Sequence, residues 1–113
     1  MIYIWKDKII DGLRGLADYN YQKKALLNPT GPVMWLFVED YQDIFEDTGL
    51  LAALKANQLV FGKSADQALR DLEYAMHQID SNLSDMVIVD LPEMQIVRQK
   101  AAKALKLIEQ ATV

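Results

Sequence analysis

The stretch that decides the fold runs from Ser64 to Asp80 and reads SADQALRDLEYAMHQID. Apolar residues recur in it at intervals of three and four residues, which places them on one side of an α-helix. This apolar stripe consists of Ala65, Leu69, Leu72, Met76, Ile79 and, just beyond the stretch, Leu83. Ser64 with Gln67 three residues later has the spacing of a capping box, which predicts that the helix begins at Ser64. We therefore expect an amphipathic helix whose centre, at Leu72 and Met76, is buried.

Similar spacings predict further helices on both sides of this stretch. These helices are expected over residues 2–27, 32–47, 50–57 and 92–111. The turn Asn28-Pro29-Thr30-Gly31-Pro32 separates the first two, because proline disfavours helix in the residue before it. Asp90 and Glu93 again have capping-box spacing, which predicts the start of the last helix. Gly12 lies beside the stripe of the first helix and would admit a close helix crossing.

Two short apolar segments, residues 58–61 and 86–89, leave the fold class open to one alternative. Each is long enough for a short strand, but neither has an obvious pairing partner within the chain. We therefore predict an all-α fold, with four to five helices in an antiparallel bundle-like array. The alternative is an α+β fold with short strands near 58–61 and 86–89. The chain has 113 residues and no linker rich in glycine or serine, so we expect one helical domain over 1–113.

The composition excludes several classes of protein. Apolar residues make up 51% of the chain and charged residues 25%, as in a soluble globular protein. The absence of cysteine excludes disulfide scaffolds and cysteine-based zinc sites, and the single histidine excludes multi-histidine metal sites. The longest apolar run, Val33 to Val38, is much shorter than the roughly 20 residues of a membrane helix. We expect a cytoplasmic protein that needs no cofactor and enters no membrane.

The charge is unevenly distributed along the chain. The net charge is −4, but residues 31–90 carry −8 while residues 1–30 and 91–113 each carry +2. The acidic middle would suit a protein partner with a basic surface. Nucleic acid is not expected as a partner, because binding to phosphates requires a clustered positive surface. The basic residues of the last helix are spread along its length, as on a solvated face; they are Arg98, Lys100, Lys103 and Lys106.

The spacing of several acidic residues is compatible with a metal-dependent enzyme. Asp43-Ile-Phe-Glu46 resembles the first Glu-x-x-Glu pair of the all-α nucleotide pyrophosphatases of the MazG type, and Asp71 follows on the next long helix. That resemblance implies magnesium-dependent hydrolysis, with Asp43, Glu46 and Asp71 as candidate metal ligands. The second pair of that family has no counterpart, because Tyr74 stands three residues after Asp71. The first pair also falls on the opposite side of its helix from the apolar stripe.

No catalytic constellation can be read elsewhere in the chain. His77 has Glu73 and Asp80 within one helical turn, but no recognisable nucleophile element accompanies it. The sequence does not decide whether the protein is an enzyme, although it favours a protein without catalytic activity.

Two binding functions remain. The first and last helices have wider apolar faces than a small bundle requires, which favours a homodimer that buries them. The expected interface residues are Tyr3, Ile10, Tyr21, Ile96 and Leu107. The other possibility is a small apolar ligand held between helices, with Trp35, Phe37 and Met76 as candidate pocket residues.

Overall fold

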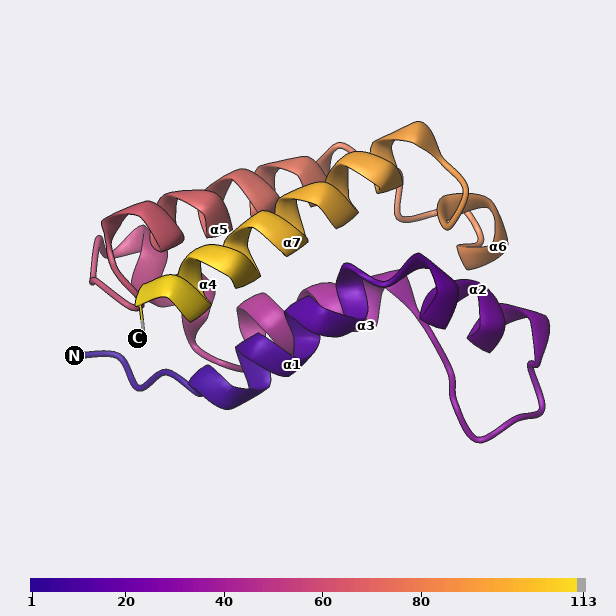
Figure 1. Cartoon of the computed structure of the whole chain (residues 1–113), viewed down its shortest axis with the longest axis horizontal. Coiled ribbons are helices and arrows are strands. Elements are labelled where there is room, and N and C mark those ends of the chain that lie inside the picture. The colour runs from indigo at the N-terminus through magenta and orange to yellow at the C-terminus, as the bar shows by residue number, and fades with distance from the viewer. Residues whose placement is uncertain (112–113) are drawn as a thin grey trace.

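The computed structural model describes residues 1–111, and within them the chain folds into seven α-helices and one π-helix (Figure 1). No strand occurs in this part of the chain, which confirms the all-α class. The strand alternative is wrong at both segments. Residues 58–61 lie in a loop, and residues 86–88 belong to a short helix, α6 (Asp85–Ile88). The helix count exceeds the expected four to five, because short helices form where a continuous helix or a connection was predicted.

Two long antiparallel helices form one side of the molecule (Figure 1). They are α5 (Lys63–His77) and α7 (Pro92–Ala111). Their inner stripes face each other and the rest of the core, and both Leu72 and Met76 are buried as predicted. Leu105, in contrast, is only partly buried, at the edge of the core. No helix within residues 1–111 is long and apolar enough to cross a membrane.

The predicted first helix over 2–27 is in fact two helices, α1 (Lys6–Leu16) and α2 (Tyr19–Leu27). Asp18 separates them, because its carboxylate caps α2 by accepting the Tyr21 N–H at 3.0 Å. The side-chain amide of Gln22 then donates to the carbonyls of Gly15 and Leu16, at 3.0 and 2.8 Å, and so satisfies the end of α1.

The first five residues are extended rather than helical, because the loop after α4 (Leu50–Lys55) pairs with them. The side chain of Gln58 accepts the Ile2 N–H and donates to the Ile2 carbonyl, both at 2.9 Å. The Trp5 N–H donates to the Thr48 carbonyl at 3.0 Å. These contacts provide the hydrogen bonds that a helical turn would otherwise supply.

The second predicted helix does not begin at Pro32. Residues 28–36 are non-helical, and α3 (Phe37–Tyr41) begins only where the carboxylate of Asp85 accepts the Phe37 N–H at 3.0 Å. The π-helix η1 (Gln42–Glu46) continues α3 and packs against α1. A Cβ atom on Gly12 would lie 2.5 Å from the Ile44 side chain, so this glycine permits the close crossing expected from the sequence.

The start of α5 also differs from the prediction. The helix begins at Lys63 after Gly62, and Ser64 forms no side-chain cap. Instead Asp66 is buried, and its two carboxylate oxygens accept the N–H groups of Val60 and Phe61 at 2.8 and 2.9 Å. This residue of the first turn therefore fixes the preceding loop against the helix.

Candidate functional site: a groove between α5 and α7

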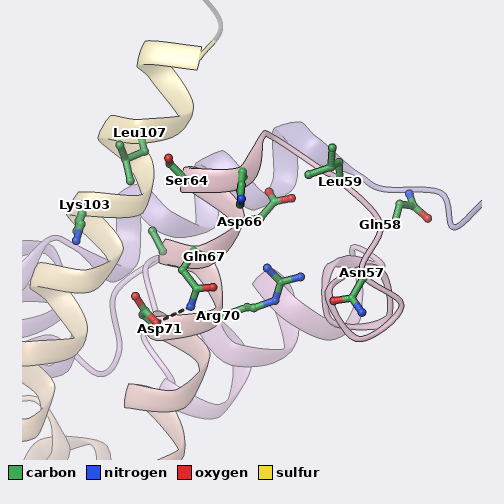
Figure 2. A pocket seen from close by; sticks show the side chains of 12 residues that line it. Asn57, Gln58, Leu59, Ser64, Asp66, Gln67, Arg70, Asp71, Lys103 and Leu107 are labelled. Carbon is green, nitrogen blue, oxygen red and sulfur yellow. Dashed lines mark hydrogen bonds between the residues drawn. The ribbon is translucent and has the colours of Figure 1, made fainter.

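The outer side of the α5 and α7 pair carries two adjacent hollows of about 590 and 540 Å³. Figure 2 shows the first, which is lined by the loop after α4, the first turns of α5, and Lys103 and Leu107 of α7. The second lies between the later turns of α5 and the start of α7, and Asp71 lines both. We call the two together the α5–α7 groove.

Exposed apolar side chains mark the α5–α7 groove. Leu59 is 71% exposed, Tyr74 69% and Ile96 48%, and Leu107 is partly buried beside them. Tyr74 and Ile96 lie off the inner stripes of their helices and Leu59 lies in the loop before α5, so much of the surface of these three side chains is exposed. A row of large apolar groups in one depression is more typical of an interaction surface than of ordinary solvent-exposed surface.

The charges of the groove differ between its two ends. Lys63 and Lys103 line one end, and Glu93 lines the other. Asp71 on α5, which lines both hollows, accepts a hydrogen bond from the side-chain amide of Gln67 at 3.0 Å (Figure 2). Lys100 of α7 lines the second hollow together with Glu93. Both hollows also contain charges of the other sign, so the lining of the first is positive overall and that of the second negative overall, each by a single charge.

The five expected interface residues are not brought together. Ile96 and Leu107 both line the groove. Ile10 is partly buried against the core, because α1 contacts α7 on one side and η1 on another. Tyr3 and Tyr21 are exposed, in the extended N-terminal segment and on α2, and neither lines the groove. Sequence reasoning missed Leu59 and Tyr74, although the position of Tyr74 opposite the stripe of its helix was a signal.

The three candidate metal ligands are placed on separate elements. Asp43 and Glu46 lie on η1, where the Asp43 carboxylate is 3.7 Å from Nζ of Lys8, and Asp71 lies on α5 in the groove. Within residues 1–111, no three acidic or histidine side chains gather in a way that could hold a metal ion.

The three ligand-pocket candidates do not line one cavity. Phe37 and Met76 line a smaller cavity of about 250 Å³. Trp35 is buried outside that lining, and its indole N–H donates to the carboxylate of Asp40 at 2.7 Å.

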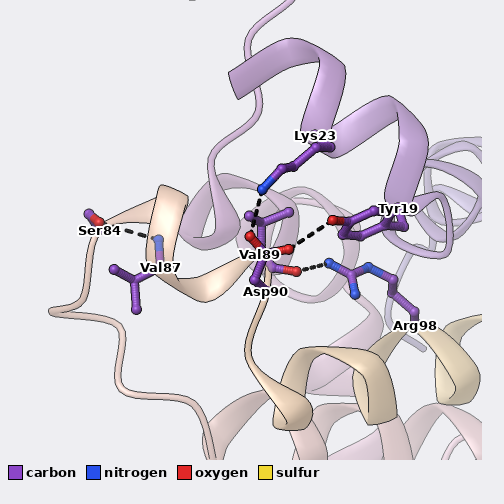
Figure 3. Close-up of polar contacts among 7 residues, drawn as sticks. All are labelled: Tyr19, Lys23, Ser84, Val87, Val89, Asp90 and Arg98. Carbon is purple, nitrogen blue, oxygen red and sulfur yellow. Dashed lines mark hydrogen bonds and ion pairs between the residues drawn. The ribbon is translucent and has the colours of Figure 1, made fainter. Parts of the chain in front are cut away.

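A cluster of polar side chains, separate from the groove, joins α2 to the start of α7 (Figure 3). Arg98 was expected on a solvated face, but it is only 6% exposed. Its Nε donates to the side chain of Gln22 at 2.9 Å, and its terminal nitrogen donates to the Val89 carbonyl. The guanidinium also lies 4.6 Å from the centre of the Tyr19 ring. These partners satisfy the buried guanidinium group and hold α2 against the start of α7.

Asp90 completes this cluster from the connection before α7. Its carboxylate accepts the Tyr19 hydroxyl at 2.8 Å and the Lys23 ammonium at 2.6 Å. These two hydrogen bonds lower the pKa of Asp90, and the same carboxylate raises the pKa of both Tyr19 and Lys23. The contact ties α2 to the last connection of the chain.

No family model, curated protein or solved structure matches this chain. Function must therefore be inferred from the surfaces of the molecule. The α5–α7 groove combines the largest hollows described above with exposed apolar side chains and charged ends, which is the chemistry of a binding surface.

Proposed function

We propose that this protein is a non-catalytic interaction protein that forms a homodimer through the α5–α7 groove. The observation that carries the proposal is the row of exposed apolar side chains in a groove with opposite charges at its two ends. Burying Leu59, Tyr74 and Ile96 against a second copy removes their apolar surface from water, at roughly 25 cal/mol per Å².

The distribution of charge suits a two-fold arrangement. In a two-fold interface the same surface contacts itself in the opposite direction. An axis through the middle of the groove, near Asp71, would bring Glu93 of one copy toward Lys103 of the other, and the converse. Both ends of the interface would then join unlike charges, which favours this arrangement over a parallel one.

A dimer interface of ordinary size would have to extend along most of the side formed by α5 and α7. A stable interface buries roughly 800 Å² on each partner. That is about an eighth of the 6813 Å² surface of this chain. The α7 helix has 20 residues, so at 1.5 Å per residue it spans about 30 Å, most of the 40 Å length of the molecule.

Sedimentation equilibrium at tens of micromolar tests the proposal. The expected mass is twice the 12.9 kDa of the chain. Ile96→Glu should shift the protein toward the monomer, because it replaces an apolar side chain of the proposed interface with a charged one. Val87→Glu is the matched control, since Val87 is 49% exposed and lies outside the groove. Its mass should stay that of the wild type.

A charge exchange tests the arrangement within the dimer. Glu93→Lys and Lys103→Glu should each weaken association, and the double variant should restore it, because the opposite charges would again face each other. A wild-type protein that stays at the mass of one chain, or equal weakening by Ile96→Glu and Val87→Glu, would refute the proposal.

A further inference from the structure

A pocket of about 350 Å³ lies between α2 and the connection that follows it. This connection leaves the end of α2 in a wide arc and returns to α3 (Figure 1). At roughly 30 Å³ for each water-sized group, the volume holds a ligand of about ten non-hydrogen atoms. Six residues line the pocket: Tyr21, Lys24, Ala25, Asn28, Pro32 and Val33.

The sequence of α2 and of the turn after it explains why these residues meet. Tyr21, Lys24, Ala25 and Asn28 follow one another at intervals that place them on one side of the helix and its last turn. The Gly31 N–H then donates to the Asn28 carbonyl at 3.0 Å, which closes a turn and brings the following residues back toward α2. A Cβ atom on Gly31 would clash with the side-chain nitrogen of Asn28, so this glycine leaves room for the amide.

Most of the pocket wall is apolar. Ala25 is buried, at 6% exposure, whereas Tyr21 and Val33 are both 42% exposed and Pro32 is exposed beside them. A ligand with a ring or a short hydrocarbon chain would therefore cover apolar surface that is now in contact with water.

Two hydrogen-bond donors accompany this apolar wall. Within residues 1–111, no hydrogen bond or ion pair engages the Lys24 ammonium group or the side-chain amide of Asn28. The neighbouring Lys23 differs, because its ammonium group is held by the Asp90 carboxylate at 2.6 Å. Lys24 is thus the cation of α2 that is available to a ligand, and both it and the amide of Asn28 can donate to an oxygen atom.

The charge around the pocket favours an anion. None of the six lining residues is acidic, and residues 19–38 contain no aspartate or glutamate at all, although the whole chain has a net charge of −4. The preceding acidic residue, Asp18, lies at the other end of α2, where its carboxylate accepts the Tyr21 N–H. A carboxylate that reached Lys24 would form a charge-assisted hydrogen bond without competition from a carboxylate of the pocket.

We propose that this pocket binds a small organic carboxylate with an aromatic or aliphatic body. The carboxylate accepts hydrogen bonds from Lys24 and Asn28, while the body packs against Ala25, Pro32 and Val33. This site is independent of the proposed dimer, because it shares no lining residue with the α5–α7 groove.

NMR titration with three compounds of the same body tests this proposal. They are phenylacetate, 2-phenylethanol and 2-phenylethylamine, which differ in the charge of the head group. We expect phenylacetate to bind about tenfold or more tightly than the alcohol, because only the carboxylate forms a charge-assisted hydrogen bond with Lys24. The amine should bind more weakly still, since its charge repels that of Lys24.

Two substitutions at Lys24 should change this order. Lys24→Gln should weaken phenylacetate binding about tenfold and remove the preference over the alcohol. Lys24→Glu should reverse the order, so that the amine binds more tightly than phenylacetate. Lys106→Gln and Lys106→Glu are the matched controls, because Lys106 is exposed on α7 and outside the pocket, and they should keep the order of the wild type. Circular dichroism reports whether each variant is folded.

The location of binding gives a second measurement in the same titration. Phenylacetate should shift the amide resonances of Lys24, Ala25 and Val33, and leave those of the α5–α7 groove unchanged. Three outcomes would overturn the proposal: equal affinity for all three compounds, no binding of phenylacetate at millimolar concentration, or equal weakening by Lys24→Gln and Lys106→Gln.

Discussion

Asp40 provides a sharp test of the electrostatics of the fold. Burial raises the pKa of this carboxyl to about 6, the Trp35 hydrogen bond opposes that effect, and the nearby carboxylates Asp43, Glu39 and Asp85 add to it. At neutral pH the folded protein therefore holds a charged carboxylate in an unfavourable environment. Asp40→Asn removes the charge and keeps an oxygen that can accept the indole N–H.

The magnitude follows from linkage between proton binding and folding. The folded pKa of about 6 lies above the ordinary 3.8, so the folded state binds the proton more tightly. The resulting stabilisation is complete below 3.8 and is lost as the pH rises through about 6. At 1.36 kcal/mol per pH unit, that interval corresponds to about 3 kcal/mol. The folded pKa already includes the opposing effect of the Trp35 hydrogen bond, so Asp40→Asn should stabilise by about 3 kcal/mol at pH 7.5.

Urea denaturation of both proteins, followed by circular dichroism from pH 7.5 down to 4.5, measures this difference. The advantage of Asp40→Asn should shrink steadily below pH 6, because the wild-type carboxyl becomes neutral. Asp7→Asn, at an exposed position on α1 that does not act on the Asp40 carboxyl, is the control and should show no such trend. A difference between Asp40→Asn and the wild type that stays constant with pH, or a variant less stable at pH 7.5, would refute the reasoning.

Three further substitutions test the core, the acidic cluster and the buried arginine. Leu72→Ala should lower the free energy of unfolding by about 2–5 kcal/mol, whereas Leu27→Ala, at a residue that is 66% exposed and lies outside the groove, should change it by less than about 0.5 kcal/mol in the same urea titration. Asp43→Asn combined with Glu46→Gln should leave stability within about 0.5 kcal/mol; magnesium-dependent turnover of a nucleoside triphosphate, abolished by that double change, would contradict a surface role. Arg98→Met should cost about 2–4 kcal/mol in urea denaturation, because two buried acceptors lose their donor.

The two long helices could be predicted from the sequence because their apolar stripes face each other. Leu72 and Met76 on α5 and Val97 on α7 are buried where the 3.6-residue period places them. In such a pair the local pattern and the tertiary packing agree, so no distant contact has to override the pattern.

The break in the first helix could not be predicted from the apolar period, which continues through residues 17–19 without interruption. The decisive groups are polar. Asp18 caps the second helix, and Gln22 takes up the last carbonyls of the first while its own oxygen is held by Arg98 from the far end of the chain. A contact between residues 22 and 98 leaves no periodic signal in either segment.

At the start of α5 the capping-box spacing is present, but the predicted side-chain cap does not form. Ser64 and Gln67 have capping-box spacing, but Asp66 between them takes the backbone N–H groups of the preceding loop instead. That loop carries Leu59 into the groove, so the same misreading concealed one of its exposed residues. Of the four large apolar residues of the groove, Ile96 and Leu107 were predicted as interface residues. Leu59 and Tyr74 could be assigned to the groove only from the positions of the loop and the helices in space.

The placement of α1 also refines the expectation of a dimer. The sequence predicts that its wide apolar face and that of α7 both contact a second copy. Gly12 lets η1 approach α1 closely, so α1 is covered by η1 on one side and by α7 on another, and Ile10 packs against the core. The surplus apolar width of α1 is thus absorbed within one chain, whereas Ile96 on α7 remains 48% exposed. A polar substitution at Ile10 should therefore lower the free energy of unfolding, whereas one at Ile96 should weaken association of the two copies. For this reason the proposed interface consists of α5 and α7 rather than α1 and α7.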